Sequence, residues 1–230
     1  VNDWAMFVTD LDDTLYREVD YVYSGYKAIG KILEENGIMP QTDVVDFLQS
    51  SENTARGFDD LAARLWLAHP GCRFTADWMV EVYRYHMPSI APLPDVIPTL
   101  ERLKAVGITI GIITDGRSVT QRSKIKALGL GEFVAPQNII ISEEVGADKT
   151  TSAPFETLAS RNIGEEKFLY IGDNPAKDFH WPNMMGWTTV ELRDCQKTNI
   201  HSQDIAVADE FRPQHIIDSF GMILKYLQYC

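Results

Sequence analysis

The stretch FVTDLDDTLY, residues 7–16, decides the fold, because an apolar run is followed at once by acidic residues. The apolar run at 5–8 is continuous rather than alternating, which is typical of a parallel strand buried on both faces. Directly after it come four polar side chains, Asp10, Asp12, Asp13 and Thr14. Ligands of open parallel sheets bind beyond the carboxyl ends of the strands. The stretch therefore predicts a buried strand that carries carboxylates to a ligand site.

Further apolar runs predict an α/β fold. They indicate buried strands at 108–113, 139–141 and 168–171, with a fifth strand at 187–192. The patterns between and after them predict helices at about 96–105, 119–128, 151–160 and 214–228. Alternating strands and helices imply a parallel sheet with right-handed crossovers. We therefore predict a core with a Rossmann-like parallel sheet.

A long insert separates the first strand from the second. Residues 16–93 lie between them, whereas a simple crossover needs only about a dozen residues or more. Apolar residues recur in the insert with helical spacing, near 28–33, 58–65 and 78–83. We therefore predict a core domain of residues 1–15 and 94–230 and a helical cap domain of residues 16–93.

The acidic character of the chain limits its partners. Its 33 Asp and Glu residues against 21 Lys and Arg give a formal net charge of −12. Such an excess repels nucleic-acid backbones and anionic membranes, so we expect no nucleic-acid and no membrane partner. An anionic substrate would need a local positive site. We expect a monomer or a homodimer.

The sequence shows no sign of export. No apolar run approaches the roughly 20 residues that span a bilayer, and the first residues lack the basic and apolar regions of a signal peptide. The three cysteines, Cys72, Cys195 and Cys230, show no CxxC spacing, which favours reduced thiols over a disulfide framework or a zinc site. We therefore expect a cytoplasmic protein.

Two other predicted strands also end in polar residues. These groups are Thr114-Asp115-Gly116 and Gly172-Asp173-Asn174. Lys149 lies just before the helix that leads into the fourth strand. Acidic residues that converge at one sheet edge repel one another unless a cation lies among them. Hard oxygen ligands favour Mg²⁺, so we expect Mg²⁺ as the cofactor.

Each of these features alone has an ordinary structural explanation. The acids of residues 10–13 fit a helix N-cap with solvated carboxylates, and Lys149 alone fits an exposed lysine at a helix start. Asp13 is expected to cap the turn, because its side chain should point away from Asp10 and Asp12. The combination of four segments in order is far more specific than any one of them.

Together the four segments resemble the motifs of the haloacid dehalogenase-like (HAD) hydrolase superfamily. Residues 7–16 resemble motif I, residues 112–116 resemble motif II, and Lys149 fits motif III. Residues 172–178 match the GDxxxxD form of motif IV. The insert between motifs I and II corresponds to the C1-type helical cap of that family.

The resemblance implies hydrolysis of a phosphate ester through a covalent aspartyl-phosphate on Asp10. Mg²⁺ and Lys149 would neutralise charge as Asp10 attacks the phosphoryl group. Asp12 would protonate the leaving oxygen and then deprotonate the water that hydrolyses the intermediate, a role worth typically about 10²–10⁴-fold. Haloacid dehalogenases lack an acid at this position, so Asp12 favours a phosphatase over a dehalogenase.

The resemblance also implies a metal site. Its ligands would be Asp10, the backbone carbonyl of Asp12, and Asp173. Asp178 and Asn174 would assist by holding these ligands or their waters in place.

A phosphate site is implied beside the metal. The Thr114 hydroxyl, Lys149 and the backbone at Asp115 and Gly116 would hold the phosphate. Many relatives have Asn where this chain has Asp115, and the extra acid leaves the phosphate environment less defined. Arg117 could compensate by reaching a substrate anion, although a solvated arginine is the simpler interpretation.

The insert should carry substrate specificity, since cap residues usually select the substrate in such enzymes. Tyr16 and Arg17 lie where the chain leaves the core, and Arg56 lies in a polar break at 50–57. Small phosphorylated metabolites, including sugar phosphates and nucleoside monophosphates, suit a capped cleft better than phosphoproteins do.

Two alternatives to a phosphatase remain at the level of sequence. A phosphomutase of the β-phosphoglucomutase kind shares both aspartates, Asp10 and Asp12, and would retain the phosphate on a sugar bisphosphate. A non-catalytic metabolite-binding or phospho-acceptor module could use the same scaffold, because fold alone does not establish activity. The complete set of Asp10, Asp12, Lys149 and Asp173 favours the enzyme.

Overall fold

The computed structural model describes residues 5–50, 56–164 and 167–227. They form two compact units. One contains the described residues up to Val19 and from Ala91 onward, and the other contains Asp20–Ile90. The expected boundaries of core and insert fall near these limits, while the role of the insert as a cap stays a prediction.

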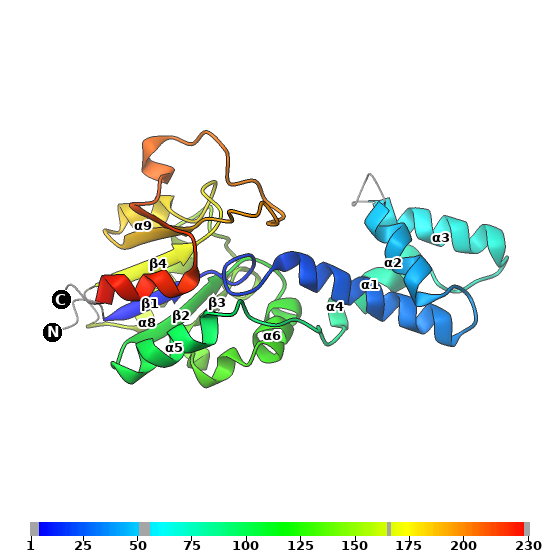
Figure 1. Ribbon diagram of the computed structural model, residues 1–230, viewed down its shortest axis with the longest axis horizontal. Helices are drawn as coiled ribbons and strands as arrows, with labels where there is room; N and C mark the ends of the chain where they lie inside the picture. The colour runs from blue at the N-terminus through cyan, green and yellow to red at the C-terminus, as the bar shows by residue number, and fades with distance from the viewer. Residues whose placement is uncertain (1–4, 51–55, 165–166, 228–230) are drawn as a thin grey trace. The chain divides into compact units, whose positions relative to one another are not determined.

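The first unit is built on a six-stranded parallel sheet with the order β3-β2-β1-β4-β5-β6 (Figure 1). The strands are β1 Met6–Thr9, β2 Thr109–Thr114, β3 Ile139–Ile141, β4 Phe168–Gly172, β5 Thr188–Leu192 and β6 His215–Ile217. Strand β1 is central and pairs with β2 on one side and β4 on the other. The strand order reverses at β1, so the crevice beyond the carboxyl ends of β1, β2 and β4 is where ligands of such sheets bind.

Helices cover both faces of this sheet. They are α5 Val96–Ala105, α6 Ser118–Ala127, the short α7 Ser142–Val145, α8 Ala153–Arg161 and α9 His180–Met184. Side chains alternate along β1, so Met6 and Val8 join a core with Phe155 and Leu158 of α8. Phe7 faces the other way and packs edge to face on Phe220, with ring centroids 5.9 Å apart.

The second unit is helical and has its own core. Its helices are α1 Glu18–Glu35, which begins in the first unit, α2 Gln41–Ser50, α3 Gly57–Ala68 and α4 Ala76–Tyr85. Ile29, Leu33, Leu61 and Met79 are buried in its centre. Helix α4 begins where the Thr75 hydroxyl accepts a hydrogen bond from the backbone N–H of Trp78.

The structure confirms the α/β fold, but the prediction of a helix at the C-terminal end of the chain is wrong. The helix expected at 214–228 is instead the edge strand β6 followed by a 3₁₀ helix at Phe220–Leu227, and Gln228 lies outside the described residues. The backbone of His215–Ile217 pairs with β5, and Phe220 and Ile223 are buried. The helix-like spacing of the apolar residues Phe220 and Ile223 therefore comes from the 3₁₀ helix and does not extend back to residue 214. Among the described residues, no helix is long and apolar enough to cross a membrane.

Leu158 tests the packing of α8 on the sheet. Its side chain is fully buried against the strands, so Leu158→Ala is expected to lower the free energy of unfolding by about 2–5 kcal/mol. Ile163, just beyond α8, is 92% exposed, and Ile163→Ala should change it by less than about 0.5 kcal/mol. Urea denaturation of both variants measures the difference. Equal losses would contradict this account of the core.

Candidate functional site

The turn after β1 brings the motif I carboxylates to the sheet edge. The backbone N–H of Asp10 still bonds to the carbonyl of Ile171 at 2.9 Å, which continues the pairing with β4. Asp13 then adopts a positive φ of 52°, a conformation that Asp tolerates better than most residues. Its carboxylate accepts hydrogen bonds from the backbone N–H groups of Glu18 at 2.8 Å and Ile200 at 2.9 Å. Asp13 thus caps the turn and the start of α1, as its position in the sequence suggested.

Lys149 lies at the centre of the sheet edge. Its Nζ is 2.8 Å from Asp10 Oδ2 and 2.6 Å from Asp178 Oδ1, and it donates to the Tyr170 hydroxyl at 3.4 Å. The side chain is 1% exposed. Burial by itself lowers the pKa of Lys149, but Asp10 and Asp178 outweigh it and hold this pKa well above its usual value. Lys149 is therefore a fixed positive charge beside Asp10.

Three buried carboxylates meet around Lys149. Oxygens of Asp10, Asp173 and Asp178 lie within 4.8 Å of one another, and all three residues are buried. Burial, and then neighbouring carboxylates, raise the pKa of Asp10 to about 7 and the pKa of Asp173 well above its usual value. A buried set of oxygen donors with excess negative charge fits a hard divalent cation, which would stabilise the ionised forms.

Motif IV shapes this cluster from the loop after β4. Asp178 Oδ2 accepts a hydrogen bond from the backbone N–H of Asn174 at 2.8 Å. The side chain of Asn174 accepts one from the backbone N–H of Ala176 at 3.0 Å, so this amide caps the turn. A Cβ atom on Gly172 would lie 2.5 Å from Asp178 Oδ2, which explains the glycine. The tight turn therefore delivers both Asp173 and Asp178 to one site.

Asp12 is held by a different set of residues. Its Oδ1 lies 2.6 Å from Lys124 Nζ and accepts a short hydrogen bond from the Tyr16 hydroxyl. Its Oδ2 accepts from Gln121 Nε2 at 2.8 Å. Burial raises the pKa of Asp12, but Lys124, Tyr16 and Gln121 together outweigh it, and the net pKa is lowered. The environments of Asp10 and Asp12 thus push their pKa values in opposite directions.

Motif II contacts the backbone of Lys149 through Asp115. Thr114 is buried, and its hydroxyl accepts a hydrogen bond from Gln121 Nε2 at 2.6 Å. Asp115 Oδ1 accepts from the backbone N–H of Lys149 at 3.1 Å, and its Oδ2 lies 2.9 Å from Lys177 Nζ. The additional acid of motif II is thus neutralised by a lysine from motif IV.

A small cavity of about 80 Å³ opens at this edge. It is lined by Asp10, Asp12, Asp13, Glu18, Asp115, Lys149, Asp173, Asn174, Lys177 and His201. Most of these residues were predicted from the motifs. Glu18, Lys177 and His201 were not, and burial followed by the charge of Asp12 raises the pKa of Glu18 to about 7.

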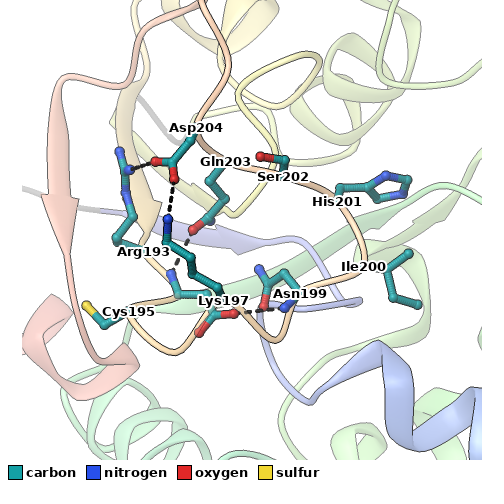
Figure 2. A pocket seen from close by; sticks show the side chains of 10 residues that line it. Arg193, Cys195, Lys197, Asn199, Ile200, His201, Ser202, Gln203 and Asp204 are labelled. Atoms are coloured by element: carbon teal, nitrogen blue, oxygen red, sulfur yellow. Dashed lines mark hydrogen bonds and ion pairs between the residues drawn. The ribbon is translucent and has the colours of Figure 1, made fainter.

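The loop after β5 also reaches the site and was missed in the sequence. Asn199 Nδ2 donates to Asp173 Oδ2 at 3.1 Å, and Gln203 Nε2 donates to the backbone carbonyl of Asp173 at 2.7 Å. Figure 2 shows the loop folded on itself, with Asp204 between Arg193 and Lys197. Its residues line a second, open pocket of about 430 Å³. The loop is polar and without periodicity, so no sequence signal marks it.

Other predicted residues lie apart from the carboxylate cluster or have unexpected partners. Gly116 has a φ of 140°, and its backbone N–H donates to Ser142 Oγ at 2.9 Å. Tyr16 is completely buried against Asp12, whereas Arg17 is exposed. Arg117 is exposed and lies 3.8 Å from Glu143.

Arg56 belongs to the second unit, where it precedes α3 and is exposed. Residues 51–55 of the predicted polar break lie outside the described residues.

Three missed residues had a recognisable signal. Gln121 and Lys124 are three positions apart on the helix that follows motif II, which places both on one helix face. Lys177 lies inside motif IV, where its charge matches the unusual Asp115. Tyr170 had no such signal, because it looked like an ordinary apolar residue of a buried strand.

Comparison with known proteins extends the match beyond the motifs. A family model described as haloacid dehalogenase-like hydrolase matches residues 7–190. The glyceraldehyde 3-phosphate phosphatase of Methanopyrus kandleri is 28% identical over 228 residues, covering 94% of this chain and 97% of the relative. The glyceraldehyde 3-phosphate phosphatase of Methanocaldococcus jannaschii is 28% identical over 190 residues, covering 80% of this chain and 82% of the relative.

A solved structure agrees with the fold. The HAD hydrolase YfnB of Bacillus subtilis, solved with bound magnesium, superposes with a TM-score of 0.63 at 18% identity. The match covers 98% of this chain and 99% of that one. Since the family model also spans all the elements that carry the carboxylate cluster, this protein belongs to the haloacid dehalogenase-like hydrolases.

Proposed function

We propose that this hydrolase is a Mg²⁺-dependent phosphatase that cleaves a small phosphorylated metabolite through an aspartyl-phosphate on Asp10. The observation that carries the proposal is the contact between Asp10 and the buried ammonium group of Lys149, beside Asp173 and Asp178. A carboxylate can attack a phosphoryl dianion only where positive charge offsets the repulsion. Lys149 supplies part of that charge.

The reaction has two steps. In the first, an Asp10 oxygen bonds to phosphorus, the bond from phosphorus to the leaving oxygen breaks, and that oxygen takes a proton from Asp12. In the second, Asp12 takes a proton from water, the resulting hydroxide attacks phosphorus, and inorganic phosphate leaves with the Asp10 carboxylate restored. The same acid thus serves both steps, and atoms and charge balance over the cycle.

The metal would be held by Asp10, Asp173 and the backbone carbonyl of Asp12, with Asp178 and Asn174 fixing their positions. Bound Mg²⁺ supplies positive charge to the phosphoryl oxygens. Lys149 holds Asp10 in place, and its contact with Asp178 ties the nucleophile to motif IV. Thr114, Lys149 and the backbone at Asp115 and Gly116 are the proposed phosphate contacts, and for Gly116 the N–H would have to exchange its hydrogen bond with Ser142 Oγ for one to the phosphate.

The names of the relatives suggest a class of substrate to test. Both of the relatives compared above carry the name glyceraldehyde 3-phosphate phosphatase, which suggests a short sugar phosphate as the first compound to test. The second unit, inserted between motifs I and II, is the proposed cap that selects among such compounds. Tyr16, Arg17, Arg56 and Arg117 are the proposed specificity residues.

Release of phosphate by Asp10→Asn tests the nucleophile. With Mg²⁺ and a panel of phosphorylated metabolites that includes glyceraldehyde 3-phosphate, wild-type protein should release free phosphate, and the variant should lose at least about 10³-fold in kcat. The exposed Asp209→Asn should match wild type and controls for the amide substitution. Near wild-type release by Asp10→Asn would exclude this mechanism. Phosphate retained on a bisphosphate sugar would indicate a mutase instead.

The pH dependence of metal binding tests the acidic cluster. In metal-free protein the raised pKa values of Asp10 and Asp173 favour the protonated carboxyls, whose stabilising contribution is lost as pH rises. For Asp10 this loss is complete above its pKa of about 7. Mg²⁺ binds the ionised forms, so it should restore stability where that loss is complete.

Thermal denaturation with Mg²⁺ and with EDTA measures this effect. The increase in Tm on adding Mg²⁺ should be larger at about pH 8 than at about pH 5.5, and it should vanish in Asp173→Asn. Asp209→Asn should keep the full increase. An increase in Tm that is equal at both pH values would show that the cation does not bind these carboxyls.

The pair of Asp115 and Lys177 tests the charge balance of the phosphate site. Lys177→Met leaves Asp115 uncompensated near the proposed phosphate, so KM for a phosphate ester should rise about tenfold, which corresponds to about 1.4 kcal/mol. The double variant with Asp115→Asn should return KM to within about threefold of wild type. Lys31→Met, exposed in the second unit, removes the same net charge and should leave KM unchanged. A double variant as impaired as Lys177→Met would rule out charge compensation.

A further inference from the structure

Helix α6 holds the carboxylate of Asp12 from across the sheet edge. Lys124 Nζ lies 2.6 Å from Asp12 Oδ1, and Gln121 Nε2 donates to Asp12 Oδ2 at 2.8 Å. Both oxygens are therefore engaged from the same helix. A carboxylate held at both oxygens, once by an ammonium group, cannot rotate without breaking a charge-assisted hydrogen bond.

The lysine of this pair is in an unusual place. The side chain of Lys124 is 5% exposed, although lysines are almost never buried unless they are paired. Nearby, the ammonium group lies 5.9 Å from the centroid of the Tyr16 ring, and the Tyr16 hydroxyl donates to the same Asp12 oxygen. Burying a lysine has a high desolvation cost, which the contact with Asp12 offsets.

Gln121 links this arrangement to motif II. Its Nε2 donates both to Asp12 and to the Thr114 hydroxyl, at 2.8 Å and 2.6 Å. Because Gln121 and Lys124 share one face of α6, the helix fixes Asp12 relative to the end of β2. Among the described residues, the side-chain donors to the Asp12 carboxylate, Tyr16, Gln121 and Lys124, all belong to the first unit.

We propose that Lys124 is a positioning residue that fixes the Asp12 carboxyl group for proton transfer to the leaving oxygen. This inference rests on the proposed function, since Lys124 acts only through Asp12. When the bond from phosphorus to the leaving oxygen breaks and that oxygen takes the Asp12 proton, a carboxylate forms beside the Lys124 ammonium. The ion pair therefore favours the product of the transfer as well as its geometry.

The dependence of kcat/KM on the leaving group distinguishes a positioning role of Lys124 from a role in packing. An alkyl phosphate needs a proton on its leaving oxygen, whereas 2,4-dinitrophenyl phosphate has a leaving group that departs without one. In Lys124→Met, kcat/KM for an alkyl phosphate that wild type hydrolyses should fall about 10- to 100-fold more than kcat/KM for the dinitrophenyl ester. Lys126→Met, exposed two residues away on α6, should show no such difference. Equal losses for the two esters in Lys124→Met would overturn the proposal.

A double-variant comparison tests whether Lys124 acts through Asp12. Single-turnover release of the alcohol from the alkyl ester is measured in Asp12→Ala and in Asp12→Ala combined with Lys124→Met. If the role is positioning, the second substitution should add less than about a threefold loss, because the group that Lys124 orients is already absent. A further loss of tenfold or more would mean that Lys124 acts elsewhere.

A third variant covers the case in which Lys124→Met does not fold, as judged by circular dichroism. Gln121→Met removes a donor from Asp12 without leaving a buried charge unpaired, and it should show the same dependence on the leaving group. The absence of that dependence would overturn the proposal.

Failure of the proposed function gives a different result. Wild-type protein would then release no phosphate from either ester, or Asp12→Ala would show no dependence on the leaving group. The role of Lys124 alone would be rejected by a different set of results. Wild type would be active, the loss of activity in Asp12→Ala would depend on the leaving group, and the loss in Lys124→Met would not.

Discussion

The buried ammonium group of Lys149 is the interaction on which the acidic edge of the sheet depends. Asp10, Asp173 and Asp178 would repel one another in so small a volume, and Lys149 contacts two of them within 2.8 Å. Removing one partner of such a group leaves an uncompensated buried charge, which is strongly destabilising. The lysine and the carboxylates are therefore stable only as a set, and the requirements of folding and of chemistry coincide at this site.

Most of the fold could be predicted because parallel strands buried on both faces leave a clear record in the sequence. The run at 139–141, for example, is a strand of the same length in the structure. Strand β6 could not be found this way, because it lies at the sheet edge and His215 and Ile216 are exposed. Its pairing with β5 is a tertiary contact that the local sequence does not show. The apolar residues that follow it have helical spacing, so the sequence predicted one longer helix.

The site residues likewise fall into a group that local sequence predicts and a group that depends on tertiary contacts. Asp10, Thr114 and Asp173 follow strand ends, so the topology alone brings them to one edge. Lys124 meets Asp12 across 112 positions of sequence, and Asn199 reaches Asp173 from an irregular loop. The spacing of Gln121 and Lys124 predicts a shared helix face, but no local pattern shows which distant residue that face contacts. The residues that follow strand ends were thus predictable, whereas most of the residues that contact them from other segments were not.

The distribution of charge explains how a chain of net charge −12 could bind a phosphate. Asp10 and Asp178 share Lys149, Asp12 contacts Lys124, and Asp115 contacts Lys177. Asp173 differs, because its carboxylate accepts a hydrogen bond from the neutral amide of Asn199. Among these five carboxylates, the least compensated negative charge is therefore that of Asp173, whose oxygens lie within reach of Asp10. A divalent cation bound there would complete the balance, which is why we assign the metal to Asp173 rather than to the carboxylates of Asp12 or Asp115.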